Sequence, residues 1–151
     1  MKWLVWISIG LALLLLTGCG SSGGELSADD RSRLDSLDAT GVVRAYFESG
    51  DQATEFHLSG PEERQWREQP DALLNREREG GISDLVIEGG REVEILGIDR
   101  EQFPEQRQFT VSYTSPRAND IGEPAGPRFF FVYVGQGDDG AWRVLSIGTG
   151  P

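Results

Sequence analysis

The sequence predicts an α+β domain in which helices come first and an antiparallel sheet follows. Three observations support this fold class. Apolar residues recur at helical spacing between residues 38 and 58, apolar and polar residues alternate in several segments after residue 81, and 151 residues suffice for one compact domain but not for two. We therefore expect N-terminal helices packed on an antiparallel sheet, preceded by a signal peptide and a flexible tether.

The chain begins with an apolar segment. Met1 and Lys2 give a positive start, and residues 3–16 form an apolar run interrupted only by Ser8 and Gly10. As a helix this run would span about 21 Å, which is short of the roughly 30 Å hydrocarbon core of a bilayer. A secretory signal peptide over residues 1–18 fits these features better than a membrane-spanning helix.

The apolar run ends in Leu16, Thr17, Gly18 and Cys19, so a pair of small residues precedes the only cysteine. This segment resembles the lipobox of bacterial lipoproteins. The resemblance implies cleavage before Cys19, lipid such as palmitate on that residue, and a protein anchored outside the cytoplasmic membrane, or at the outer membrane where the organism has one. The alternative is a plain signal peptide with a chance cysteine.

Charge and cysteine content exclude several classes of function. The formal net charge of -11 opposes binding to nucleic acid and to anionic lipid surfaces. Removal of residues 1–18 would take away Lys2, the only lysine, and would make the chain more negative still. A single cysteine cannot form an intrachain disulfide.

The segment after Cys19 is expected to be a tether over residues 19–39, followed by the domain over residues 40–151. Residues 20–24 have the Gly/Ser composition of a flexible linker. Residues 25–38 are dense in aspartate and arginine with sparse leucines, and this pattern leaves two alternatives open. The segment is either a frayed helix or a disordered stretch.

The first part of the domain is expected to be helical. Asp38 or Thr40 can cap a first helix, because each precedes apolar residues at helical spacing. A second helix is expected over residues 51–58, with Phe56 facing inward. Pro61 follows a Ser-Gly stop and is expected at the first position of a third helix.

The second half of the domain is expected to form the sheet. Strands are predicted for residues 82–87, 91–98, 106–115, 128–134 and 142–147. The segment 129–134 is apolar on both faces, so it needs cover on both. Helices can cover one face, and the other requires a loop, a partner or a second copy. By parity Phe129, Phe131 and Tyr133 share one face, and which face meets the helices stays open.

Two segments resemble the nuclear-transport-factor-2-like superfamily. Residues 41–51 are similar to its opening helix, and residues 140–151, with Trp142, are similar to its closing strand. The resemblance implies a curved antiparallel sheet that wraps the N-terminal helices as a cone with a pocket. It implies no single activity, because the superfamily holds isomerases, dehydratases, transport factors and binding domains.

His57 is the only histidine and the candidate for acid–base catalysis. In the polyketide cyclases and dehydratases that the domain resembles, a histidine–aspartate pair in the cone transfers protons. The alternative is a helix-end histidine favoured by the helix dipole. A ketosteroid-isomerase-like site would instead need a tyrosine, such as Tyr113 or Tyr133, beside a pocket carboxylic acid.

Residues 135–140 match GxGxxG but do not predict a dinucleotide loop. The segment leads into another predicted strand, and Asp138 and Asp139 would repel phosphate. We interpret Asp139 and Gly140 as a hairpin turn. One histidine and one cysteine do not make up a zinc set, and no metal or cofactor is expected.

Aromatic side chains are the remaining candidates for a pocket. Some line the cone or, more simply, fill it as core. The candidates are Trp66, Phe109, Tyr113, Phe129, Phe131, Tyr133 and Trp142.

Three functions follow from these features. The first is a non-catalytic, lipid-anchored extracytoplasmic module that binds a partner protein or a small apolar ligand. The second is an isomerase-, dehydratase- or cyclase-like enzyme that uses His57 or a cone acid. The third is a structural envelope protein that associates with itself as a homodimer, because residues 129–134 are apolar on both faces.

Overall fold

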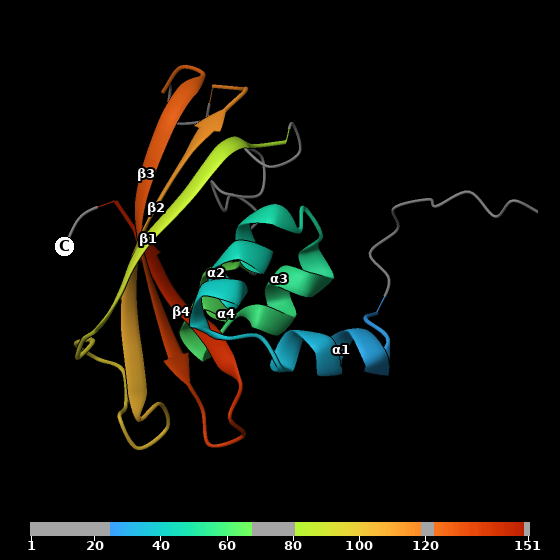
Figure 1. The fold of residues 1–151 in the computed structure, drawn as a ribbon, viewed down its shortest axis with the longest axis vertical. Helices are drawn as coiled ribbons and strands as arrows, with labels where there is room; N and C mark the ends of the chain where they lie inside the picture. Colours follow the sequence, from blue (N-terminus) through green and yellow to red (C-terminus); the bar gives the residue numbers. More distant parts are fainter. Residues whose placement is uncertain (1–24, 68–80, 119–122, 150–151) are drawn as a thin grey trace, which may run out of the picture.

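The computed structural model describes residues 25–67, 81–118 and 123–149, and over these ranges the protein is an α+β domain (Figure 1). Short helices lie on one side of a four-stranded antiparallel sheet. No helix in the described ranges has the length and apolar character needed to cross a membrane.

The helical layer is built from short segments that begin at capping residues. Ser27 caps α1, Asp38 caps α2 and Asp51 caps α3, each with a side-chain oxygen that accepts backbone N–H groups of the first turn. The helices are α1 (Ala28–Asp35), α2 (Ala39–Glu48), α3 (Gln52–Leu58) and α4 (Pro61–Arg67). The predicted start of the third helix at Pro61 is confirmed, and Asp38 rather than Thr40 is the cap of the predicted first helix.

The sheet is an antiparallel meander in the order β1-β2-β3-β4. Its strands are β1 (Ser83–Glu92), β2 (Glu105–Ser115), β3 (Gly126–Gln136) and β4 (Trp142–Gly148). The hairpin between β3 and β4 turns at Gly140, which has φ 77° and donates its N–H to the Gly137 carbonyl. The prediction of a turn at this point is confirmed, and the GxGxxG segment leads into a strand.

Two of the predicted strands are in fact one. Residues 83–87 and 91–92 both belong to β1, whereas residues 93–98 of the second predicted strand lie outside the sheet, because β1 ends at Glu92. Gly89 and Gly90 adopt positive φ values of 97° and 84°, and the register with β2 shifts there. The glycines therefore form a bulge inside a strand rather than a turn between two strands.

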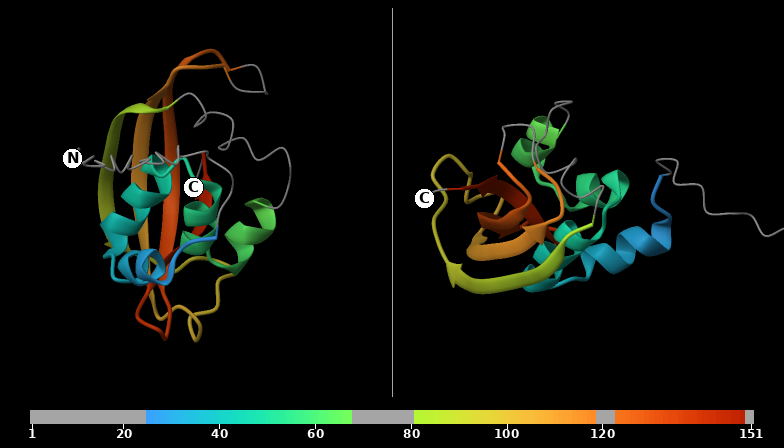
Figure 2. Two further views of the ribbon diagram at one scale, coloured as in Figure 1. Left: turned by 90° about the vertical axis from the view of Figure 1, so that its right-hand side faces the viewer. Right: turned by 90° about the horizontal axis from the view of Figure 1, so that it is seen from above.

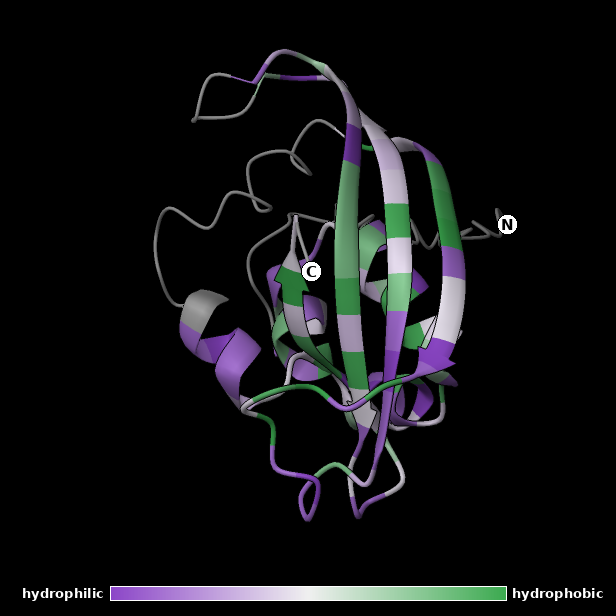
Figure 3. Ribbon diagram, turned by 90° about the vertical axis from the view of Figure 1, so that its left-hand side faces the viewer, coloured by the Kyte–Doolittle hydropathy of each residue, from purple (hydrophilic) through white to green (hydrophobic). Residues whose placement is uncertain are grey.

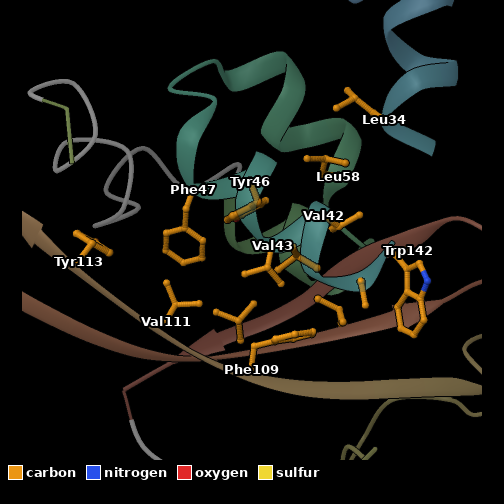
Figure 4. Packing of buried hydrophobic residues seen from close by; sticks show 14 residues of the cluster. Leu34, Val42, Val43, Tyr46, Phe47, Leu58, Phe109, Val111, Tyr113 and Trp142 are labelled. Atoms are coloured by element: carbon orange, nitrogen blue, oxygen red, sulfur yellow. The ribbon is translucent and has the colours of Figure 1, made fainter. Parts of the chain in front are cut away.

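The hydrophobic core lies between α2 and the face of the sheet that the helices cover (Figure 4). Seen end-on, the sheet curves around this layer (Figure 2). From α2, the side chains of Val42, Val43, Tyr46 and Phe47 are at most 1% exposed. They meet Val111 and Tyr113 of β2 and Val132 and Val134 of β3, so among the described residues this part of the domain is a packed core.

Helix α1 packs against the domain rather than extending away from it. Leu34 is 2% exposed and belongs to the core cluster, and Leu26 and Leu37 pack against the same cluster. Of the two alternatives that the sequence left open for residues 25–38, the structure shows the helical one.

Phe56 corrects a prediction about α3. Its side chain was expected inward and is 44% exposed, whereas Leu58 and Glu55 are the buried residues of this helix. The helix has only seven residues, so a small rotation about its axis exchanges the inward positions.

The outer face of the sheet, which the helices do not cover, is divided into two parts (Figure 3). At the lower end, the segment 93–104 brings Phe103 against Gly135, and the buried Gln106 donates to the Phe103 carbonyl. At the upper end, Phe129 is 49% exposed and Val86 is 47% exposed. The second face of residues 129–134 thus has only partial cover within the described residues.

Candidate functional site

A cavity of about 410 Å³ opens where the N-terminal end of the domain meets α3. Leu26, Ala53 and Phe56 give it an apolar wall. The remaining lining residues are polar or charged and comprise Glu25, Arg31, His57 and Arg64. The cavity therefore combines an apolar surface with imidazole and guanidinium groups, which suits a ligand with an apolar body and an anionic or hydrogen-bond-accepting group.

Asp35, the last residue of α1, joins three segments beside this cavity. Its Oδ1 lies 2.9 Å from His57 Nε2 on α3 and accepts a hydrogen bond of 2.8 Å from Arg143 on β4. Because an ionised carboxylate only accepts, His57 Nε2 carries the proton in this contact, and in the neutral form of the ring Nδ1 would be an acceptor. The side chains of His57 and Arg143 are 18% and 14% exposed and that of Asp35 is 39% exposed, so the contacts of Asp35 with His57 and Arg143, called the latch below, are only partly shielded from water.

Arg64 of α4 closes another side of the cavity. Its guanidinium lies 4.9 Å from the ring centroid of Phe56, and its Nε donates to the Phe56 carbonyl at 3.1 Å. This stacking holds the guanidinium cation at the edge of the cavity, next to its apolar wall. Arg64 also lines a second, more polar cavity of about 330 Å³ that includes Arg143 and Asp139.

Asp51 fixes the start of α3 and therefore the position of His57. Its carboxylate accepts from the Thr54 hydroxyl at 2.7 Å and from the backbone N–H groups of Thr54 and Ala53. Partial burial by itself would raise the pKa of Asp51, but these hydrogen bonds together hold that pKa below its usual value of 3.8. The cap is therefore strongest when Asp51 is ionised.

The structure brings His57 to a carboxylate, but the partner could not be read from spacing. The neighbouring Glu55 is buried on another side of α3, and Asp35 lies 22 residues away in the sequence. Arg143 is 108 residues from Asp35. Asp35 and Arg64 had no signal in the sequence that set them apart from the other surface charges.

The candidate aromatic residues divide between the two faces of the sheet. Phe109, Tyr113 and Trp142 are at most 7% exposed and pack in the core. On the outer face, Phe129 and Phe131 make an edge-to-face contact at 5.2 Å, and Tyr133 accepts a hydrogen bond from Gln108.

A tyrosine–carboxyl pair exists at a different place from the tyrosines singled out in the sequence. The hydroxyl of Tyr46 on α2 donates to Glu63 on α4 at 2.7 Å, and both residues are buried. Neither residue lines either of the two cavities described above. The pair links α4 to the core and thereby helps to position Arg64, which is the next residue of the same helix.

Two residues singled out in the sequence cannot be placed. Cys19 and the side chain of Trp66 lie outside the described part of the structure. Among the residues that are described, no three His, Cys, Asp or Glu side chains gather in a way that could hold a metal ion.

No protein-family model matches this sequence, and a comparison with curated proteins finds no significant match. The class that fold and site define is an α+β domain with a partly apolar, arginine-bordered cavity at its N-terminal end.

Proposed function

We propose that the protein is a lipid-anchored, extracytoplasmic binding module, without catalytic activity, whose ligand site is the cavity bordered by α3 and Arg64. The observation that carries the proposal is the position of this cavity. Glu25 and Leu26, only a few residues after Cys19, form part of its lining. The residues that the lipobox-like segment would fix to the membrane therefore lead directly into the ligand site.

The cavity chemistry narrows the class of ligand. Apolar walls favour a small hydrophobic body, and Arg31 and Arg64 favour a negative group. Glu25 already pairs with Arg31 at 2.6 Å, so Arg64 is the cation that remains for the ligand among the described residues. We therefore expect a small apolar anion.

The fold proposal that goes with this function is a nuclear-transport-factor-2-like domain. Its support is the order of helices before an antiparallel meander, together with a curved sheet around α2. In this proposal the filled core replaces an open cone, and the ligand site lies at the side of the helical layer.

Binding can be tested with 2-naphthalenesulfonate, a small apolar anion, added to the full-length protein in phospholipid nanodiscs. At a concentration ten times the dissociation constant, a site present only in the folded state adds about 1.4 kcal/mol of stability. Ala53→Phe fills the cavity and should abolish the rise in melting temperature. Leu96→Phe, at a fully exposed position, is the matched control and should leave the rise unchanged.

Anchoring has a separate test. Cys19→Ala should remove lipid labelling and either release the protein from the membrane fraction or stall its processing. Unchanged lipid labelling of this variant would contradict the lipobox proposal.

A second candidate function is proton transfer, and the contact between His57 and Asp35 favours it. With Nε2 held by Asp35, the Nδ1 lone pair of His57 could abstract a proton from a ligand in the adjoining cavity. Hydrogen–deuterium exchange of a small ketone such as cyclohexanone tests this directly. His57→Gln keeps a hydrogen-bond donor for Asp35 but removes the base. An enzyme should accelerate the exchange, and this variant should not. A binding module should accelerate the exchange in neither form.

A further inference from the structure

We propose that the side of the domain formed by Glu25, Leu26, Phe56 and Arg64 faces the phospholipid headgroup layer, so that the cavity opens toward the bilayer. This inference rests on the proposed lipidation of Cys19. It adds a fixed orientation and a membrane-contacting surface, which anchoring alone does not provide.

The docking of α1 shortens the free chain. Because Leu34 is buried and Asp35 is held by His57 and Arg143, the domain begins at Glu25 and not after α1. Five residues lie between Cys19 and Glu25, and even a fully extended chain over these six Cα-to-Cα steps reaches only about 20 Å.

The domain is larger than this reach. The path from Glu25 to the outer face of the sheet leads past α1, the rest of the helical layer and the sheet itself, and each helix adds about 10 Å of diameter. A body of that size on so short a connection cannot turn its opposite side to the bilayer. Figure 1 shows that α1 and α3 lie on the side of the molecule away from the outer face of the sheet.

The chemistry of this side suits a headgroup layer. Phe56 is 44% exposed, and the Arg64 guanidinium is stacked 4.9 Å from its ring centroid. An aromatic ring can enter the boundary between headgroups and acyl chains while a guanidinium binds phosphate. The net charge of -11 gives no general attraction to anionic lipid, so the connection and this local pair determine which side approaches.

The lone cysteine makes a direct experiment practical. Once Cys19 carries lipid, an introduced cysteine is the only free thiol in the chain. Two positions are suited to labelling. Gln52 is exposed and shares a helix face with Phe56, so Gln52→Cys reports on the proposed contact side. Glu88 is exposed on the outer face of the sheet, so Glu88→Cys reports on the opposite side. Each full-length variant is labelled with a fluorescent donor and reconstituted in phosphatidylcholine vesicles that contain an acceptor-labelled phospholipid, and its intact mass is measured.

We expect energy transfer at least twofold more efficient from position 52 than from position 88. A 30-residue Gly/Ser insertion after Gly24 should bring the two efficiencies close together. Equal transfer from both positions, or stronger transfer from position 88, in a protein whose mass includes the lipid would overturn the orientation alone. A mass without lipid would overturn the proposed anchor and, with it, the orientation. If the ratio of the two transfer efficiencies stays the same after the insertion, the short connection is not the cause of the orientation.

Discussion

Substitution of Asp35 tests whether α1 is an integral part of the domain. In Asp35→Ala, the hydrogen bonds of 2.8 Å from Arg143 and 2.9 Å from His57 are both lost. A hydrogen bond to a charged group contributes about 1.5–3 kcal/mol when well buried. The Asp35 side chain is 39% exposed, so solvent screening reduces each contribution, and Arg143 keeps Asp139 at 3.6 Å. We expect the free energy of unfolding to fall by about 2 kcal/mol.

Urea denaturation of the full-length protein measures this change, and hydrogen exchange of the α1 amides localises it. Asp29→Ala is the matched control, because Asp29 belongs to the same helix and its side chain makes no hydrogen bond or ion pair among the described residues. Its effect should be at most a few tenths of a kcal/mol. The latch would be refuted if Asp35→Ala lowered the free energy of unfolding by less than about 0.5 kcal/mol, as expected of an exposed ion pair, and left the hydrogen exchange of the α1 amides unchanged.

Three further outcomes can be measured. Gly135→Ala should lower the free energy of unfolding by about 1–3 kcal/mol in urea, because the added Cβ would lie 2.6 Å from Leu145 Cδ1. Asp51→Ala should cost about 1 kcal/mol at neutral pH, measured the same way. Because the folded pKa of Asp51 is lowered, its ionic contribution is complete above pH 3.8 and is lost as the pH falls further, so Asp51→Asn should flatten acid denaturation there. If the outer face binds a second copy, light scattering should show a mass that rises with concentration and that Phe129→Asp reduces; a monomer at every concentration removes self-association.

Local signals in the sequence predicted much of the helical layer and the last hairpin. Asp38 and Pro61 act on the backbone within a few residues, so their effect can be read without knowing the fold. Gly140 similarly supplies the positive φ that the β3–β4 turn needs.

The sheet could be predicted less well where one local signal has two outcomes. Adjacent glycines such as Gly89 and Gly90 permit either a turn or a bulge, and pairing with β2 decides between them. Phe56 presents the same difficulty on a helix. A seven-residue segment carries too few apolar positions to define which face is buried.

The site depends on contacts that no spacing reveals. Asp35 was one of many acidic residues in a charged segment, and it acquires its role only because α1 folds back onto α3 and β4. The lipobox-like segment, in contrast, is a contiguous motif and needs no fold to be noticed. This difference explains why the anchor could be proposed to the residue and the ligand site could not.

The sharing of Asp35 bears on the choice between binding and catalysis. If Asp35 bonded to His57 alone, its full negative charge would stabilise the imidazolium that forms during proton transfer. Here the same oxygen atom also accepts from Arg143, a permanent cation, which offsets that charge. The contact holds α1 in place, and through α1 it keeps Leu26 in the cavity wall. The geometry therefore favours a structural role of the Asp35 carboxylate in the site over a role in a reaction. We expect Asp35→Ala to lose ligand binding and to leave ketone exchange unchanged.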